Sequence, residues 1–249
     1  MQKILLVSIV IGDAYQKNYA QYYYENHQSY AKQCGYDFTV CTDFIDPNNQ
    51  HTSFISFQKI LVCSGSESLK YDYIVVVDAD ILFNLSRAEP IHENIKSPEK
   101  IYIVDEFCQP SYEKRIMYNI KYGYERSASE YYAQSGLHLD TNLLLNTGVM
   151  IFNPQIHKDF LEKIYIEGLK KGLNHPRGFH YEQSLVGYYL QKEKMYSLLP
   201  TCWNAIFALQ NGASPGELTL SEFYRKNKAI HFAGGHVFES SIPELIKSS

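Results

Sequence analysis

The sequence predicts an α/β protein with a mixed, mainly parallel central sheet and helices on both of its faces. Two observations lead to this prediction: short apolar runs alternate with amphipathic stretches, and most of the apolar runs are continuous. Continuous apolar runs are typical of strands buried on both faces, as in a parallel sheet covered by helices. With 249 residues, 45% of them hydrophobic, the chain is long enough to bury a sizeable core in one domain.

The expected elements follow from the positions of the apolar runs, glycines and prolines. We expect strands at 4–10, 38–41, 73–77, 101–104, 148–152 and 229–232, and helices at 15–34, 57–62, 154–171 and 182–191. The leucines at 143–145 lead into the strand at 148–152, and Asn146 and Thr147 interrupt it. The segment 107–139 is polar, tyrosine-rich and weakly periodic, and its pattern favours neither helix nor strand.

Charge and cysteine usage argue against several classes of protein. A formal net charge of −4 gives no electrostatic footprint for nucleic acid, so we expect no nucleic-acid partner. The five cysteines lack a Cys-x-x-Cys pair, which argues against a zinc knot or a disulfide framework and favours a cytoplasmic location. The longest apolar run, at 4–11, is too short for a transmembrane segment. That run after Lys3 also fits a signal peptide, but it fits the first strand better.

Two acids stand inside an otherwise apolar segment, directly after the predicted strand at 73–77. Asp78 and Asp80 are two residues apart, so on an extended chain their side chains share a face. Two close carboxylates repel each other, and a bound divalent cation resolves that conflict. The carboxyl end of a strand in an open α/β sheet is also where ligands bind. The pattern predicts a metal site that grips a diphosphate, with a solvated pair in a loop as the alternative.

Further motifs accompany the acidic pair in a fixed order along 4–235. They are a strand entering a loop and helix at 7–15, a basic residue at 59, Asn-Thr-Gly at 146–148, Glu-Gln at 182–183 and His-Phe-Ala-Gly at 231–234. With them the sequence resembles the retaining glycosyltransferases of the GT-A fold, in the family that contains glycogenin and bacterial lipopolysaccharide galactosyltransferases. The galactosyl/xylosyltransferase family is similar too. The resemblance implies one domain over 1–249, with a nucleotide-binding half at 1–105 and a half for donor sugar and acceptor at 106–249.

On the nucleotide side, the resemblance implies that Ile9, Val10 and Tyr15 contact the nucleoside, with Tyr15 against uracil. It also implies that Lys59 touches the donor, where a cation near a sugar diphosphate makes electrostatic sense. The competing interpretations are ordinary ones: Tyr15 is one of 22 tyrosines, and Lys59 fits a solvated helix position.

For the metal, the resemblance implies that Asp78 and Asp80 are ligands, that Asp78 also serves the ribose, and that His231 is the third ligand. One nitrogen among oxygen ligands favours Mn²⁺ over Mg²⁺. A buried core histidine is the alternative for His231.

For the donor sugar, the resemblance implies two further groups of residues. The substrate-binding group is Asn146, Thr147, Gly148 and Gly234, and the catalytic group beneath the sugar is Glu182 and Gln183. The family usually has Asp where this chain has Glu182, and members with the histidine motif often continue with a lysine that reaches the diphosphate, where this chain has His236. The tyrosine-rich segment 107–139 lies where the family closes a loop over donor and acceptor.

The resulting hypothesis is metal-dependent transfer of a hexose or similar sugar from a nucleoside diphosphate sugar, a UDP-sugar, to a hydroxyl of a glycan or glycoconjugate acceptor, with retention of anomeric configuration. Inversion stays open. Two alternatives come from other classes: a phosphohydrolase of the haloacid dehalogenase type, which also uses Asp-x-Asp after an apolar strand, and a sugar-nucleotide-binding protein without transfer activity. The donor base, the acceptor and the oligomeric state are not readable from these motifs.

Overall fold

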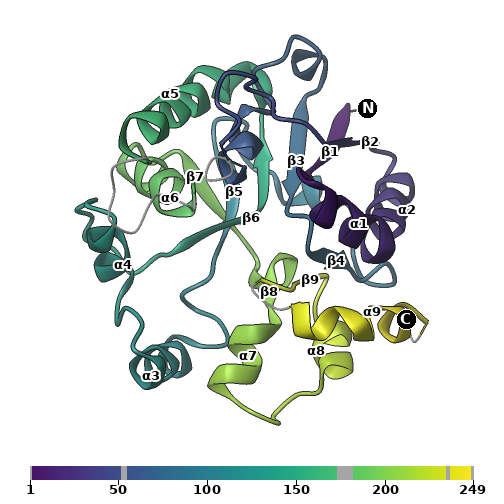
Figure 1. Cartoon of the computed structure of the whole chain (residues 1–249), viewed down its shortest axis with the longest axis vertical. Helices are drawn as coiled ribbons and strands as arrows, with labels where there is room; N and C mark the ends of the chain where they lie inside the picture. Colours follow the sequence, from purple (N-terminus) through teal and green to yellow (C-terminus); the bar gives the residue numbers. More distant parts are fainter. Residues whose placement is uncertain (1, 52–54, 173–181, 234–235, 248–249) are drawn as a thin grey trace.

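The computed structural model describes residues 2–51, 55–172, 182–233 and 236–247. Its centre is a six-stranded sheet with the strand order β2-β1-β3-β6-β5-β7 (Figure 1). These strands are β1 (Ile4–Ile9), β2 (Asp37–Cys41), β3 (Tyr73–Val77), β5 (Ile101–Asp105), β6 (Leu145–Phe152) and β7 (Tyr196–Leu199).

The central sheet is mixed, because one strand runs against the others. The neighbours β1–β2, β1–β3 and β5–β7 pair in parallel, whereas β6 is antiparallel to both β3 and β5. All eight residues of β6 are buried. The strand predicted at 148–152 is therefore longer than expected, and Asn146 and Thr147 belong to it. The irregularity lies instead in the pairing with β5, where the register shifts between Ile103 and Val104.

Alternate side chains of the sheet enter two separate cores. Ile74 and Val76 of β3 belong to one buried cluster, and Val75 and Val77 belong to another. The first cluster is covered by α4 (Ala128–Gln134), α5 (Pro154–Gly172) and α6 (Glu182–Lys192), and the second by α2 (Tyr24–Cys34). Helices therefore cover both faces, and the predicted α/β fold class is confirmed.

A second, three-stranded sheet has the order β4-β9-β8 and joins the middle of the chain to its end. Its strands are β4 (Ile81–Phe83), β8 (Ala205–Ile206) and β9 (Ala229–His231). Around it lie α1 (Asp13–Tyr22), α7 (Phe207–Ala213), α8 (Leu220–Lys226) and α9 (Ile242–Lys247) (Figure 1). Because β4 begins directly after the acidic pair, this sheet brings the C-terminal residues to that pair.

Three helical segments differ from the expectation. The helix predicted at 15–34 is two helices, α1 and α2, because Tyr23 between them leaves helical geometry with φ −122° and ψ −31°. Its buried ring packs on Phe232, and its hydroxyl donates to Glu239, so long-range contacts fix the break. The predicted helix at 57–62 is a 3₁₀ helix at Ser56–Leu61. The segment that the sequence pattern did not resolve contains α3 (Tyr112–Tyr122) as well as α4.

No helix in the described ranges combines the length and the apolar character needed to cross a bilayer. The five cysteines all lie in those ranges as free thiols.

Candidate metal and nucleotide-sugar site

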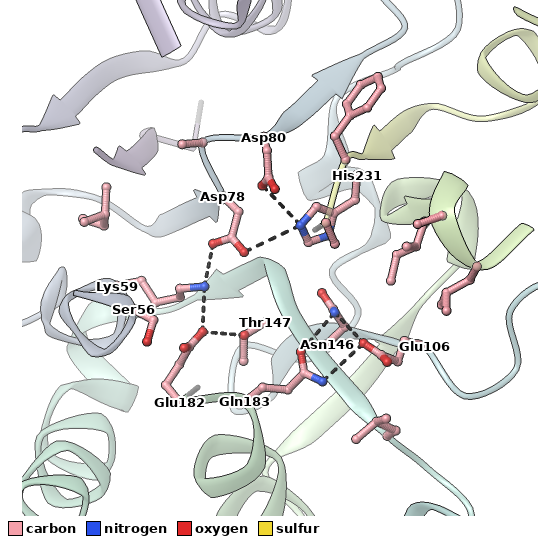
Figure 2. A pocket seen from close by; sticks show the side chains of 18 of the residues that line it. Ser56, Lys59, Asp78, Asp80, Glu106, Asn146, Thr147, Glu182, Gln183 and His231 are labelled. Carbon is pink, nitrogen blue, oxygen red and sulfur yellow. Dashed lines mark hydrogen bonds and ion pairs between the residues drawn. The ribbon is translucent and has the colours of Figure 1, made fainter. Parts of the chain in front are cut away.

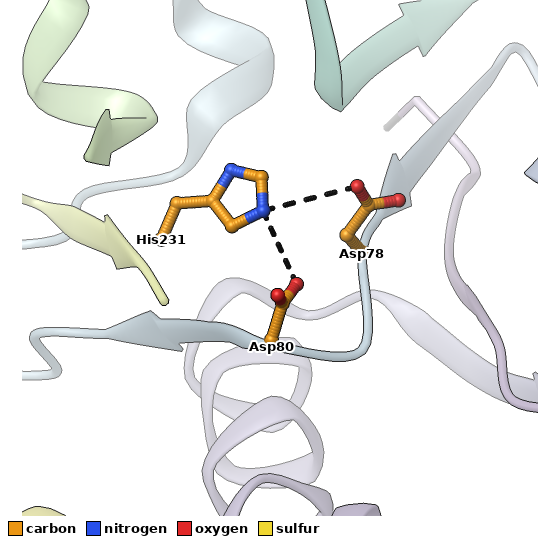
Figure 3. Close-up of side chains that lie close together, drawn as sticks. All are labelled: Asp78, Asp80 and His231. Carbon is orange, nitrogen blue, oxygen red and sulfur yellow. Dashed lines mark ion pairs between the residues drawn. The ribbon is translucent and has the colours of Figure 1, made fainter. Parts of the chain in front are cut away.

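Three side chains that could hold a metal ion come together beyond the carboxyl end of strand β3 (Figure 3). Nε2 of His231 lies 3.2 Å from Oδ1 of Asp80 and 3.9 Å from Oδ2 of Asp78. Strand pairing causes this meeting, since Ile81 pairs with His231 and the amide of Phe232 donates to the carbonyl of Asp80 across 3.0 Å. The predicted convergence of two mid-chain acids and a late histidine is thus present in the fold.

The two acids share a side for a different reason from the one expected. Strand β3 ends at Val77, and residues 78–80 form a turn in which the amide of Ile81 donates to the carbonyl of Asp78 across 3.2 Å. The expectation that Asp78 and Asp80 share a face because the chain is extended there is therefore wrong. The turn is held at its start by the amide of Asp78, which donates to the carbonyl of Gly148 on β6 across 2.8 Å.

The other nitrogen of His231 is fixed by an amide. Its Nδ1 lies 2.9 Å from Oδ1 of Asn204, whose Nδ2 donates to Oδ1 of Asn146 across 2.6 Å. The Asn204 oxygen is therefore the acceptor, so Nδ1 of His231 carries a proton, and Nε2, which offers a lone pair in the neutral ring, faces the two acids. A metal-binding imidazole needs this arrangement, because the second nitrogen sets the tautomer and the ring orientation.

The ring of His231 also needs space at Gly148. A Cβ added there would lie 2.7 Å from Cε1 of His231 and 2.9 Å from Oδ1 of Asn146. Glycine at this position therefore lets the imidazole approach the backbone of β6. That Gly148 itself contacts a substrate stays a prediction.

Neighbouring charges shift the pKa values of the cluster. Burial lowers the pKa of His231, but Asp80 and Asp78 outweigh burial and raise that pKa above its ordinary value. Burial raises the pKa of Asp80, yet the same imidazole outweighs it and holds the pKa below its usual range. For Asp78 burial dominates over the attraction of Lys59 and His231, so its pKa is raised. The two acids thus stabilise positive charge on the imidazole that lies between them.

A buried lysine joins this cluster to the start of α6 (Figure 2). Nζ of Lys59 lies 2.5 Å from Oδ1 of Asp78 and 2.6 Å from Oε1 of Glu182. The same carboxylate oxygen of Glu182 accepts from Oγ1 of Thr147 across 2.5 Å. Burial lowers the pKa of Lys59, but the two acids outweigh it and raise the pKa, so the ammonium stays charged. Lys59 thus holds Asp78 and Glu182 in place.

A second polar network lies beside the first and centres on Glu106, directly after β5 (Figure 2). Its Oε2 accepts from Nδ2 of Asn146 across 2.6 Å and from Nε2 of Gln183 across 3.2 Å. Its Oε1 accepts from Nη2 of Arg115 across 2.7 Å. Oε1 of Gln183 in turn accepts from Nδ2 of Asn146 across 3.0 Å. Both ends of the Gln183 amide are therefore engaged, which fixes its orientation.

Both networks line one cavity of about 790 Å³, which is within the size range of small-molecule sites. Most of the residues singled out from the sequence line it: Ile9, Val10, Tyr15, Lys59, Asp78, Asp80, Asn146, Thr147, Glu182, Gln183 and His231. Gly148 lies behind the ring of His231, and Gly234 lies outside the described residues. The contacts of these residues with a donor stay predictions.

The donor set fits a divalent cation. Two carboxylates and an imidazole nitrogen offer ligand atoms within 4.8 Å of one another, and the lone pair of His231 faces both acids. Oxygen and nitrogen ligands together suit a first-row metal such as Mn²⁺ and also admit Mg²⁺.

Comparisons with known proteins place this architecture. No protein-family model and no curated protein matches the sequence. Among solved structures, a glycosyltransferase involved in the glycosylation of the major capsid of PBCV-1 is similar with a TM-score of 0.62 at 16% identity, covering 99% of this chain and 100% of that chain. The galactosyltransferase LgtC, solved with donor and acceptor sugar analogues, is similar with a TM-score of 0.58 at 11% identity, covering 98% of this chain and 95% of that chain. The chain has the GT-A fold.

A third GT-A neighbour is the bifunctional glycosyltransferase WbbM, with a TM-score of 0.64 at 15% identity. The match covers 100% of this chain and 50% of WbbM, so the chain spans half the length of that protein. We call Asp78, Asp80 and His231 the metal-type cluster. In the GT-A fold of this chain, the cluster lies beyond the carboxyl end of β3, and ligands of open α/β sheets bind at the carboxyl ends of the strands.

Three residues of the site were not identified from the sequence: Glu106 and Arg115, which line the cavity, and Asn204, which bonds His231 and Asn146. Glu106 had a usable signal, because Asp105 and Glu106 directly follow the predicted strand at 101–104, just as Asp78 follows its strand. Arg115 lies in the segment that the pattern did not resolve. Asn204 had no signal, since a single asparagine in a loop is ordinary.

Proposed function

We propose that this protein is a metal-dependent glycosyltransferase that moves a hexose from a UDP-sugar to a glycan hydroxyl with retention of anomeric configuration. The observation that carries the proposal is the cluster of Asp78, Asp80 and His231, with its fixed histidine tautomer, inside the cavity. The GT-A fold of three glycosyltransferase neighbours supports it. Those neighbours give no support to the phosphohydrolase alternative.

In the proposed reaction, the bond between the anomeric carbon and the β-phosphate oxygen breaks. The oxygen of an acceptor hydroxyl forms the new bond on the same face, and its proton passes to the departing diphosphate. A divalent cation, when bound by the three side chains, would supply positive charge where the leaving group becomes negative.

The residues of the chain would divide the binding work. Ile9, Val10 and Tyr15 line the part of the cavity at β1 and α1, where we place the nucleoside, with the exposed ring of Tyr15 against the base. Lys59 would keep Asp78 ionised and oriented toward the diphosphate. Glu182 would then act through Lys59 and Thr147, since its Oε1 is bonded to both.

Gln183 and Asn146 would bind hydroxyls of the donor sugar. An amide both donates and accepts hydrogen bonds, so a fixed amide recognises a hydroxyl well. The Oε1 atom of Gln183 already accepts from Asn146, which supports a role as a polar support for the anomeric carbon and not as a nucleophile. Analysis of the product anomer by NMR would decide between retention and inversion.

The test is a transfer assay combined with a thermal-shift screen of nucleotide sugars, with and without Mn²⁺. We expect UDP-sugars to raise the unfolding temperature only with the metal present, and Asp80→Asn to reduce transfer at least about 100-fold while the protein stays folded. Asp159→Asn is the matched control, because that carboxylate is 96% exposed on α5. Full transfer by Asp80→Asn without added metal would contradict the proposal, and metal-dependent UDP binding without transfer would favour a binding protein.

A further inference from the structure

The cavity continues beyond the Glu106 network to an end formed partly by the tyrosine-rich segment 107–139. This far end is formed by α3, the residues after it, and α7, and these two helices lie side by side (Figure 1). It is lined by Arg115, Tyr118, Tyr124, Glu125 and Leu209. The far end thus combines aromatic rings with charged groups in the same cavity as the metal-type cluster.

The two tyrosine rings are held by local structure. Helix α3 ends at Gly123, whose φ of 71° turns the chain back, and the amide of Tyr124 donates to the carbonyl of Asn119 across 2.8 Å. The returning Tyr124 ring stacks on Tyr118, with centroids 5.9 Å apart and planes 22° apart. Tyr118 itself rests on α7 at Gly212, where an added Cβ would lie 2.3 Å from its ring.

A buried guanidinium provides the polar part of the far end. Nε of Arg115 donates to Oδ1 of Asn119, Nη2 to Oε1 of Glu106 and Nη1 to the Glu106 carbonyl, at 3.1, 2.7 and 3.4 Å. A guanidinium carries five N–H groups, so within the described ranges two of them remain for a ligand. Arg115 is only 7% exposed and lines the cavity, so little bulk water competes there for its unused donors.

The charges of the far end select the kind of ligand. Arg115 is already neutralised by Glu106, and Glu125 adds another negative charge nearby. A ligand with its own carboxylate or phosphate would therefore be repelled, whereas a neutral ligand with hydroxyls would not. Aromatic rings with neighbouring hydrogen-bond groups fit such a ligand, because its apolar CH face packs on a ring while its hydroxyls accept hydrogen bonds.

From these contacts we infer that the far end binds the acceptor as a neutral pyranose, with its CH face on the ring of Tyr124 and a hydroxyl on the free donors of Arg115. The inference rests on the proposed function, which places the nucleoside at the opposite end of the cavity and the metal-type cluster between them. A sugar leaving the diphosphate then meets an acceptor at α3 and α7.

The test uses saturation-transfer NMR of the whole chain with Mg²⁺ and UDP, and the probes are methyl glucoside, methyl galactoside, lactose and maltose. We expect at least one probe to bind, and Tyr124→Ala to weaken its binding about tenfold, or about 1.4 kcal/mol, because the ring that covers the CH face of the sugar is lost. Tyr124→Phe keeps the ring and should bind like the wild type. Gly212→Ala should weaken binding by displacing Tyr118. The control is Met117→Ala on α3, which should have no effect because Met117 is exposed and does not line the cavity.

The affinity for UDP with metal is measured for each variant and should stay unchanged, which separates the two proposals. Unchanged UDP binding without binding of any probe, or with Tyr124→Ala binding as well as the wild type, would overturn the acceptor site and leave the proposed function standing. Stronger binding of methyl glucuronoside than of methyl glucoside would overturn the choice of a neutral sugar. If the wild-type protein does not bind UDP in a metal-dependent way, both proposals are overturned.

Discussion

Asn204 accepts a hydrogen bond from Nδ1 of His231 across 2.9 Å, and this contact determines which nitrogen of the imidazole faces the two acids. The bond comes from the residue just before β8, which lies beside β9 in the small sheet. Asn204 also donates to Asn146, so it connects the metal-type cluster to the network around Glu106 and Gln183.

We expect Asn204→Ala to weaken Mn²⁺ binding by about 10- to 100-fold, because the imidazole loses the partner that sets its tautomer and orientation. Asn204→Asp keeps an acceptor for Nδ1 and should retain most of the affinity. Isothermal titration calorimetry with MnCl₂ measures both, and circular dichroism checks the fold. Equal losses in the two variants would show that the hydrogen bond is not what matters.

The space at Gly148 gives a second prediction for the same ring. Gly148→Ala places a Cβ within 2.8 Å of Nδ1 of His231, so the imidazole must move, and we expect Mn²⁺ binding to be lost with a destabilisation of about 2 kcal/mol. Gly65→Ala is the matched control, since the added Cβ would make only an ordinary contact 3.7 Å from Oγ of Ser68. Denaturant unfolding and calorimetry provide the two measurements. Normal metal binding by Gly148→Ala would place the ring of His231 elsewhere.

Much of the fold could be predicted because its signals are local. The valines of β3 form a continuous apolar run. Asp78 places a charge among these apolar residues, where burying a charge is costly unless it has a partner or a ligand. The turn at 78–80 was not predictable from alternation, because it depends on the amide of Asp78 bonding to Gly148 on β6. Contacts between residues far apart in the chain, such as Asn204 with Asn146, leave no pattern along the sequence.

The tyrosine-rich segment shows the same limit from another side. Helix α3 has a capped start at Ser111 and a left-handed glycine at its end, Gly123, and both are visible in the sequence as helix boundaries. Its buried residues include Arg115 and Asn119, which bond each other and Glu106 at the cavity, where an apolar stripe would otherwise lie. Helical periodicity of apolar residues is therefore weak where buried positions of the helix hold a polar network.

The buried lysine leads to a prediction about stability. Lys59→Met removes the only cation bonded to Glu182 among the described residues and leaves this buried carboxylate uncompensated, while Asp78 keeps His231 as a neighbour, so we expect a loss of about 3 kcal/mol at pH 7. The double variant Lys59→Met/Glu182→Gln should be more stable than the single one, because the uncompensated charge is gone. Urea unfolding measures both. The surface pair of Lys170, whose side chain is 64% exposed, and Glu167 is the control, and Lys170→Met should change stability by less than about 0.5 kcal/mol.

The packing of His27 predicts how stability depends on pH. The ring is fully buried between α2 and the small sheet, its Nε2 lies 2.7 Å from the carbonyl of Ile81, and its Nδ1 accepts from the hydroxyls of Ser8 and Tyr19. Burial lowers the pKa of His27 from 6.5 to about 4. The folded state therefore holds the ring neutral where the unfolded chain protonates it, and stability falls as the pH drops from 6.5 toward 4. The loss approaches about 3 kcal/mol at the acid end of this window.

His27→Gln separates this residue from the other titrating groups, since an amide keeps hydrogen-bonding capacity but does not titrate between pH 4 and 6.5. The variant should start with lower stability at pH 7, and it should lose less stability than the wild type on acidification, by roughly the amount attributed to His27. Urea unfolding of both proteins at several pH values gives the two slopes. Parallel slopes would mean that His27 takes up its proton over the same pH range in the folded protein as in the unfolded chain, so that burial and the hydrogen bonds at its Nδ1 do not keep the ring neutral.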